Sequence, residues 1–212
     1  LLIAEAPTGY GKTYETIQAI YRYIEKGGKS QILFITNLLK NLPDDELRNI
    51  YEQNGRGALF KKEVLVLSSV ASNVEKVILT ENIPPEFQTD AYQELLSACQ
   101  KKKQYQQQFG EAGKDITKHM GDQIREKLEP QFRRELEVHL QNTFPGGPGP
   151  RRDAIRNKEK YKWMATFYPA IFWTEYKVLL LSVKKLMARN ISLVEPSFDC
   201  LSERMLKNKI VC

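Results

Sequence analysis

The residues with the clearest chemistry lie near the start of the sequence, in the run Ala6, Pro7, Thr8, Gly9, Tyr10, Gly11, Lys12 and Thr13. Gly9 and Gly11 carry no Cβ, so the backbone can wrap tightly and point several N–H groups at a phosphate. Lys12 can reach the β- and γ-phosphates of a triphosphate, and the Thr13 hydroxyl can bind Mg²⁺. We therefore predict that residues 6–13 bind ATP and Mg²⁺, with Lys12 and Thr13 acting on the phosphates.

The patterns on both sides of this loop predict the elements that position it. Residues 1–4 form a short apolar run, which is typical of a buried strand. Apolar residues then recur at helical spacing over residues 13–26, and Gly27-Gly28 ends the pattern. A helix beginning at Thr13 would direct the positive end of its dipole at a bound anion. The expected order is therefore strand, loop and helix.

Further strands and helices alternate along the chain. A helix is expected after Pro43, because Asp44, Asp45 and Glu46 suit the positive end of a helix dipole. Apolar runs predict strands at residues 32–35, 64–67, 178–181, 191–194 and 209–212, and a short helix at 183–187. This alternation predicts an α/β fold with a parallel sheet and crossover helices.

A change of pattern after Pro84-Pro85 divides the chain. Polar sequence with a long helical period continues to about residue 139, and residues 144–150 form a segment rich in Pro and Gly, which predicts an irregular linker. We predict three parts: residues 1–83 as the first part of the α/β core, 84–160 as a helical insertion, and 161–212 as the second part of the core.

Composition limits the class of protein. The 212 residues carry a formal net charge of +6, which favours a polyanionic partner such as nucleic acid. Cys99, Cys200 and Cys212 have no metal-ligand spacing, which predicts reduced thiols in the cytoplasm. The longest apolar run, residues 178–181, is too short to cross a bilayer, so we expect no membrane association.

Several basic segments have two interpretations. Lys101-Lys102-Lys103, close to Tyr105 and Phe109, either binds nucleic-acid phosphates beside a stacking ring or forms a solvated helix face. The pairs Arg133-Arg134 and Arg151-Arg152 leave the same two interpretations open.

The histidines and late aromatic residues favour structural roles. His119 and His139 have no partners for metal binding or base catalysis, so we expect both on the exposed surface. Aromatic residues between 161 and 176 recur at helical spacing, which favours packing on the core over a base-stacking surface.

Three segments resemble superfamily 2 helicases, the DEAD/DEAH-box group and its relatives. The run Ala-Pro-Thr-Gly-Tyr-Gly-Lys-Thr at 6–13 is similar to motif I, in which alanine often takes the first position. Phe34-Ile35-Thr36-Asn37, followed by Leu38-Leu39-Lys40, is similar to motif Ia. Residues 178–186 resemble the strand and turn that read T-P-x-x-L in this family, although Ser182-Val183 replaces Thr-Pro. The start Glu-Ala-Pro-Thr-Gly is also similar to that of CRISPR-associated helicase-nucleases.

The resemblance implies a RecA-like P-loop NTPase domain that binds DNA or RNA. It implies that Thr36, Asn37 and Lys40 contact the nucleic-acid backbone. It also implies a second RecA-like domain in the same chain, which would close with the first around a strand when ATP binds.

The acidic pair that such an ATPase needs to hold Mg²⁺ and position water does not follow any predicted strand. Glu195 follows residues 191–194 but lacks the preceding aspartate. Residues 209–212 end where Asp-Glu is expected next, so we expect the acidic motif to follow residue 212 and this fragment to be inactive by itself.

Three hypotheses remain open from the sequence. The chain is the ATP-binding part of a helicase or translocase, the motor part of a restriction or CRISPR system, or a regulatory module that binds a nucleotide without hydrolysing it. A small-molecule P-loop kinase fits poorly with Ala6 and with residues 34–37.

Overall fold

A computed structural model describes residues 12–212, except for the side chains of Lys12 and Arg204. The strand expected at 1–4 and the residues Ala6, Pro7, Thr8, Gly9, Tyr10 and Gly11 lie outside the described residues. The described chain forms two compact units, each with its own core. The first comprises residues 12–67, 173–189 and 199–212, and the second comprises 68–172 and 190–198.

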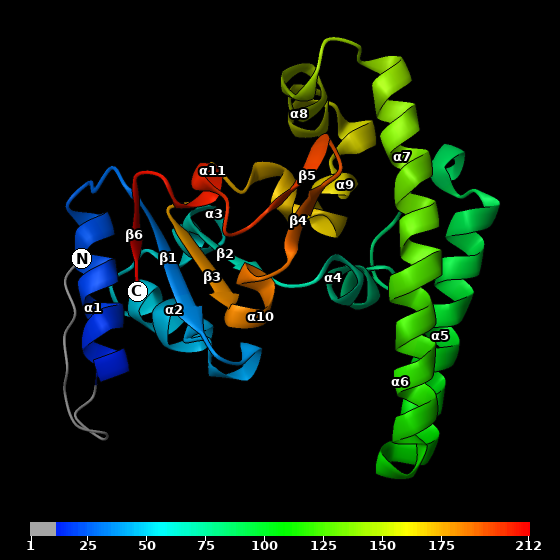
Figure 1. The fold of residues 1–212 in the computed structure, drawn as a ribbon, viewed down its shortest axis with the longest axis horizontal. Helices are drawn as coiled ribbons and strands as arrows, with labels where there is room; N and C mark the ends of the chain where they lie inside the picture. Colours follow the sequence, from blue (N-terminus) through cyan, green and yellow to red (C-terminus); the bar gives the residue numbers. More distant parts are fainter. Residues whose placement is uncertain (1–11) are drawn as a thin grey trace. The chain divides into compact units, whose positions relative to one another are not determined.

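The first unit is an α/β structure built on a four-stranded parallel sheet (Figure 1). The strands lie in the order β2-β3-β1-β6, and their bounds are Gln31–Thr36 for β1, Val64–Leu67 for β2, Val178–Ser182 for β3 and Lys209–Val211 for β6. Register places Leu33 opposite Leu179 and Val211. The central strand β3 has no exposed side chain, as expected for parallel strands, and each buried leucine contributes roughly 1.5–3 kcal/mol.

Helices cover one face of this sheet. The helical elements of the first unit are α1 (Lys12–Glu25), η1 (Leu39–Asn41), α2 (Asp44–Gln53), α3 (Gly57–Glu63), α10 (Val183–Leu186) and α11 (Glu203–Leu206). Ile17, Ile20 and Ile24 of α1 are buried in one cluster with Phe34 of β1 and Leu180 of β3. The apolar face of α1 therefore packs against the side chains that β1 and β3 present on one face of the sheet.

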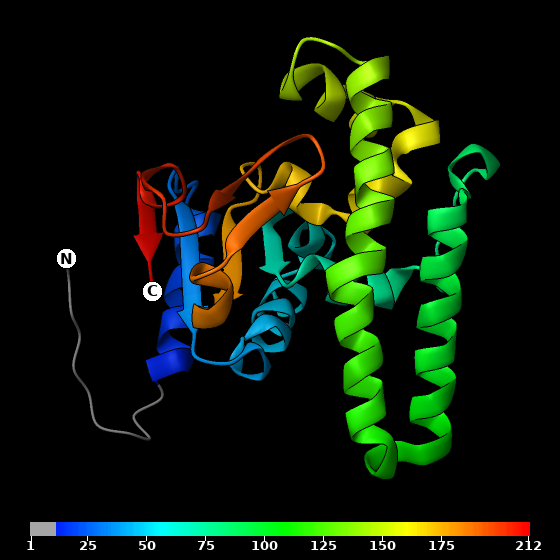
Figure 2. The ribbon, with the colours of Figure 1, turned by 45° about the vertical axis from the view of Figure 1, so that its right-hand side comes forward.

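The second unit is mainly helical. Its elements are α4 (Val70–Val77), η2 (Pro85–Phe87), α5 (Asp90–Phe109), η3 (Gly110–Gly113), α6 (Lys114–Gln123), η4 (Ile124–Leu128), α7 (Glu129–Thr143), α8 (Pro148–Asn157), η5 (Glu159–Tyr161), α9 (Trp163–Phe167) and η6 (Pro169–Phe172). The chain reverses between α5 and α6 at Gly110, whose φ of 51° suits a residue without Cβ. From η3 to Thr143 the chain runs back beside α5 (Figure 2).

A two-stranded sheet of β4 (Arg189–Ser192) and β5 (Glu195–Asp199) completes the structure. This hairpin belongs to the second unit except for its end residues, Arg189 and Asp199.

Most elements expected from the sequence are confirmed. These are the strands near 32–35, 64–67, 178–181 and 209–212, the helices after Thr13 and Pro43, and the helical segment after Pro84. The strand expected at 191–194 lies two residues earlier, as β4 at 189–192, because Leu193-Val194 form a turn. The linker expected at 144–150 is shorter, because α8 begins at Pro148, where a missing N–H costs a helix nothing.

Candidate nucleotide and nucleic-acid site

The candidate site lies at the carboxyl edge of the parallel sheet. Helix α1 begins on the side of the sheet at which the arrows of β1 and β3 end (Figures 1 and 2). In open α/β sheets, ligands bind outside the carboxyl ends of the strands, where helix N-termini also gather. The start of the first helix and the end of the next strand therefore face the same side of the sheet.

Thr13 lies in the first turn of α1, and its side chain is exposed. Farther along the helix, Ile17 and Ile20 are 2% and 4% exposed, so the core holds the helix in place. The backbone of Lys12 begins α1, while its side chain and Ala6–Gly11 lie outside the described residues. Convergence of Lys12, Thr13 and the glycines on a phosphate stays a prediction.

The residues expected to contact nucleic acid follow β1 directly. Thr36 ends β1, and its hydroxyl donates a hydrogen bond to the Leu38 carbonyl at 2.8 Å, which tightens the turn. Asn37 and Lys40 are exposed, and Lys40 lies in the single turn η1. The structure brings these three residues together at the carboxyl edge, with their polar groups accessible.

Ser182 ends β3, directly opposite Thr36 in the sheet. Its side chain is buried and accepts a hydrogen bond from the Lys185 backbone N–H at 3.2 Å, so it caps α10. Lys184 is exposed on α10, whereas burial lowers the pKa of Lys185. The Ser-Val that stands at the Thr-Pro position therefore has a local structural role.

Carboxylates do not gather at this edge in the described residues. No Asp-Glu pair follows β1, β2 or β3, and no group of His, Cys, Asp and Glu suited to a metal ion is found in residues 12–212. Glu195, weighed as the acidic residue after a strand, instead begins β5 outside the parallel sheet. Its side chain is 4% exposed and pairs with Arg152 at 3.1 Å, so that interpretation is wrong.

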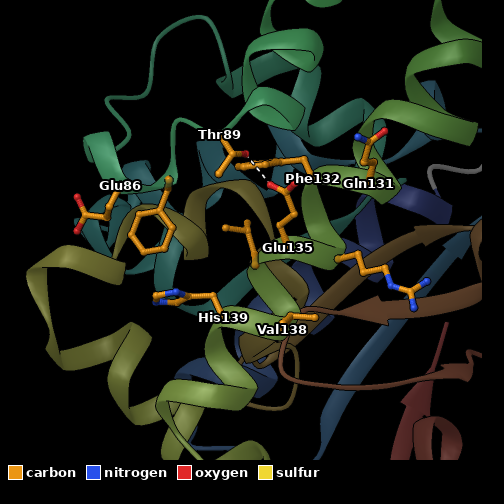
Figure 3. Close-up of a pocket in the computed structure, with 10 residues that line it drawn as sticks. Glu86, Thr89, Gln131, Phe132, Glu135, Val138 and His139 are labelled. Carbon is orange, nitrogen blue, oxygen red and sulfur yellow. Dashed lines mark hydrogen bonds between the residues drawn. The ribbon is translucent and has the colours of Figure 1, made fainter.

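A cavity of about 540 Å³ lies elsewhere, in the second unit, along one side of α7 (Figure 3). Its floor is apolar and includes the buried Phe87 and Phe132. At its rim, the Thr89 hydroxyl donates to Glu135 at 2.5 Å, as the dashed line in Figure 3 marks. Glu86, also at the rim, pairs with Lys160 at 3.1 Å. Both carboxylates of the rim thus already have partners.

His139 lines the same cavity and is half-buried, so the expected exposed position is wrong for this residue, although His119 is exposed. Its ring meets Phe87 edge-on at 5.0 Å, and its Nε2 lies 3.3 Å from the Tyr161 hydroxyl. Burial, together with the nearby Lys160 ammonium, lowers the pKa of His139. A neutral imidazole packed on aromatic rings has a structural role here.

The basic segments separate into solvated and structural groups. Lys101 and Lys103 are exposed, while Lys102 pairs with Glu75. Arg151 and Arg152 of α8 donate to backbone carbonyls within the second unit, so they support its structure. Most of the aromatic residues between 161 and 173 are buried, which confirms the core interpretation for that stretch.

Sequence reasoning missed a second, polar cavity in the same unit. It is lined from α7, α8 and the β4–β5 hairpin. The available signal was the four-residue spacing of Arg133, Glu137 and Gln141, which puts these three side chains on one helix face.

No protein-family model matches the sequence, and a comparison with curated proteins gives no match either. Among the helices of residues 12–212, none combines the length and the apolar character that a membrane span requires.

Proposed function

We propose that this chain is the ATP-binding part of a nucleic-acid-dependent ATPase, a helicase or translocase of RecA-like P-loop fold. The observation that carries the proposal is the pattern of residues 6–13, whose last two residues begin α1, a helix that starts at the carboxyl edge of a parallel sheet. Phosphate-binding loops occupy that position because the loop after the strand and the helix N-terminus both present backbone N–H groups there.

In this proposal Lys12 neutralises the β- and γ-phosphates and Thr13 binds Mg²⁺, as the resemblance to motif I implies. Gly9 and Gly11 allow the close approach of the backbone. The exposed position of Thr13 at the start of α1 supports this assignment, because a metal-binding hydroxyl must be accessible.

The sheet register indicates where an acidic pair that followed β6 would lie. Leu33 of β1 lies opposite Val211 of β6, and the Cys212 N–H donates to the Leu33 carbonyl at 2.8 Å. Residues continuing β6 in the same register would pass Ile35 and Thr36 and reach the carboxyl edge. An acidic pair after Cys212 would therefore meet the edge at which α1 begins.

Nucleic acid would contact the turn after β1. Thr36 closes this turn, and the exposed Asn37 and Lys40 present an amide and an ammonium group suited to phosphate oxygens. The formal net charge of +6 agrees with a polyanionic partner.

The first test is ATP turnover by the full-length protein, with and without single-stranded DNA or RNA. We expect turnover that nucleic acid stimulates, and we expect Lys12→Ala to abolish it because the phosphates lose their cation. Lys26→Ala, at an exposed lysine just after the same helix, is the matched control and should keep wild-type turnover. Equal loss in both variants, or no turnover in the wild type, would contradict the motor proposal.

One alternative has an observation in its favour. No acidic pair follows a strand of the parallel sheet in residues 12–212, which suits a module that binds a nucleotide and does not hydrolyse it. Tight ATP binding without turnover by the full-length protein would support this alternative. A nuclease domain in that protein would favour the motor part of a restriction or CRISPR system.

The nucleic-acid contact has its own test. Lys40→Ala should weaken binding of single-stranded nucleic acid and lower the slope of log affinity against log salt by about 0.7, because one phosphate contact is lost. The matched control is Lys61→Ala, an exposed lysine of α3. Equal salt slopes for wild type and Lys40→Ala would exclude Lys40 from the contact.

A further inference from the structure

A groove of about 420 Å³ lies in the second unit, and α4, the turn after α4 and α5 line it. Helix α4 contributes Glu75 and Lys76, and α5 contributes Lys102, Lys103 and Gln106. All of these residues belong to the same compact unit. We call this surface the basic groove.

The basic groove has an excess of positive charge, because its charged residues are three lysines and one glutamate. Lys102 pairs with Glu75. Lys76 and Lys103 are exposed and have no carboxylate partner in the described residues. Two positive charges therefore stay uncompensated in the groove. In three other cavities of the same unit, the numbers of positive and negative lining side chains differ by at most one.

The surroundings of the groove do not supply the missing negative charge. Cys99 also lines it, but burial and the nearby Glu75 raise the pKa of its thiol to about 12, so the thiol is neutral. On α5 and the turn after it, no acidic residue occurs between Glu94 and Glu111. Glu94 lines a different cavity, and Glu111 pairs with Lys114 at 3.2 Å. A negatively charged partner would therefore complement this surface.

Side chains on the same face of α5 connect the groove with an exposed aromatic ring. Lys102, Gln106 and Phe109 recur at spacings of four and three residues, which places them on one side of the helix. Gln106 is exposed and adds amide donors to the lining. Phe109 is 43% exposed, and its ring centroid lies 4.4 Å from that of Tyr105. A positively charged groove next to an aromatic ring is the combination that binds single-stranded nucleic acid.

We propose that the basic groove binds the backbone of a single-stranded nucleic acid, with the Lys76 and Lys103 ammonium groups at phosphates and a base stacked on Phe109. Two uncompensated charges favour a polyanion over a neutral ligand. The exposed ring favours a single strand over a duplex, because the bases of a duplex already stack on one another. This contact uses other residues than the turn after β1, and it does not require that the chain hydrolyses ATP.

Binding is tested by fluorescence anisotropy of the full chain, without ATP, with labelled oligothymidylate and, separately, labelled oligouridylate over a series of salt concentrations. Lys76→Ala and Lys103→Ala should each lower the slope of log affinity against log salt by about 0.7, because one phosphate contact is lost. At about 0.1 M salt, this change of slope corresponds to roughly fivefold weaker binding.

The matched control is Lys101→Ala. Lys101 is exposed on the same helix, but it lines a different cavity together with Glu94. This variant removes the same charge from the chain and should keep the wild-type slope. Unchanged slopes in Lys76→Ala and Lys103→Ala, or an equal decrease in Lys101→Ala, would overturn the proposal.

Phe109→Ala tests the stacked base. It should weaken binding about fivefold or more and leave the salt slope unchanged, because the ring carries no charge. Val138→Ala removes an apolar side chain of α7 that is 48% exposed, and it should bind as the wild type does. Unchanged affinity in Phe109→Ala would contradict the stacking contact.

The same lysine variants in a Lys40→Ala background separate the basic groove from the turn after β1. Two independent contacts should lower the salt slope additively. A lower slope in Lys103→Ala but not in Lys40→Ala would contradict the contact at the turn and support the groove. A lower slope in Lys40→Ala alone would overturn the groove and leave the contact at the turn supported.

Discussion

Glu63 of the first unit and Glu129 of the second are both buried, and their environments differ in the number of donors around the carboxylate. Glu63 of the first unit accepts a hydrogen bond from the Tyr51 hydroxyl at 2.8 Å. Lys177 lies 2.7 Å and Arg56 3.5 Å from its other oxygen. Burial by itself would raise the pKa of Glu63, but the contacts with Lys177 and Tyr51 outweigh it and lower the pKa.

Glu129 of the second unit has Arg133 as its cation at 3.0 Å, but Arg133 also contacts Glu137 at 2.7 Å. Burial raises the pKa of Glu129, and the shared guanidinium does not offset that effect. The comparison shows that burial fixes the sign of a pKa shift only where the donors around the group are too few or are shared.

The two cores can be compared in the same way. Aromatic rings form a similar share of both, four of the 14 buried residues in the first core and seven of the 23 in the second, but the first is built around strands and the second around helices. In the second, Phe132 lies 5.5 Å from Tyr92 and 6.3 Å from Trp163 between ring centroids. One large ring there contacts several helices, so its loss affects most of the unit.

The largest expected effect comes from truncating one buried side chain in each core, in separate variants. Phe132→Ala should destabilise the second unit by about 3–5 kcal/mol, and Leu180→Ala should destabilise the first by about 2–5 kcal/mol, through lost burial and the cavity left behind. Residue-resolved hydrogen exchange measures both. Each variant should accelerate exchange chiefly in its own unit, because local opening follows cooperative units.

Val138→Ala is the matched control for Phe132→Ala. Val138 lies on the same helix and is 48% exposed, so its truncation should change stability by less than about 0.5 kcal/mol. Equal acceleration across both units in Phe132→Ala would show a single cooperative core and break the comparison.

The elements that the sequence predicts well are those with an uninterrupted local pattern. Residues 32–35 and 178–181 are continuous apolar runs, and the structure confirms them as strands. Residues 191–194 misled because Leu193 and Val194, at 3% and 1% exposed, are apolar turn residues with no glycine or asparagine to mark the turn. Because these two turn residues are buried in the core, they are apolar, and the sequence pattern does not distinguish them from a strand.

The candidate sites show the same limit. The start of α1 and the turn after β1 are predictable, because each follows directly from a local motif. The polar cavity is not predictable, because Arg133, Arg151 and Ser192 come from three elements that the chain brings together only by folding. In the sequence, its arginines are also not distinguished from ordinary surface charge.

The two buried glutamates should contribute to stability with opposite pH dependence. At neutral pH, Glu63→Gln should cost about 1–3 kcal/mol, since a charged acceptor with several donors is lost. Because its folded pKa is lowered, the stability from Glu63 is fully present above the unfolded value of about 4.3 and is lost as pH falls through the folded pKa. For Glu129 the folded pKa is raised. The stability that Glu129 contributes is therefore fully present below the pKa of the unfolded chain and is lost as pH rises through the folded pKa.

Urea unfolding of wild type, Glu63→Gln and Glu129→Gln between pH 4 and pH 8 measures how each glutamate changes the free energy of unfolding with pH. The stability lost in Glu63→Gln should shrink as the pH falls. Glu129→Gln should change stability by less than about 1 kcal/mol at neutral pH, because Arg133 keeps Glu137 and a buried charge is removed. Relative to wild type, Glu129→Gln should then become less stable as the pH falls, since protonated Glu129 no longer carries a buried charge. If both variants instead lost stability at neutral pH and recovered it in acid, Glu129 would have a lowered pKa, and sharing of Arg133 would not distinguish the two sites.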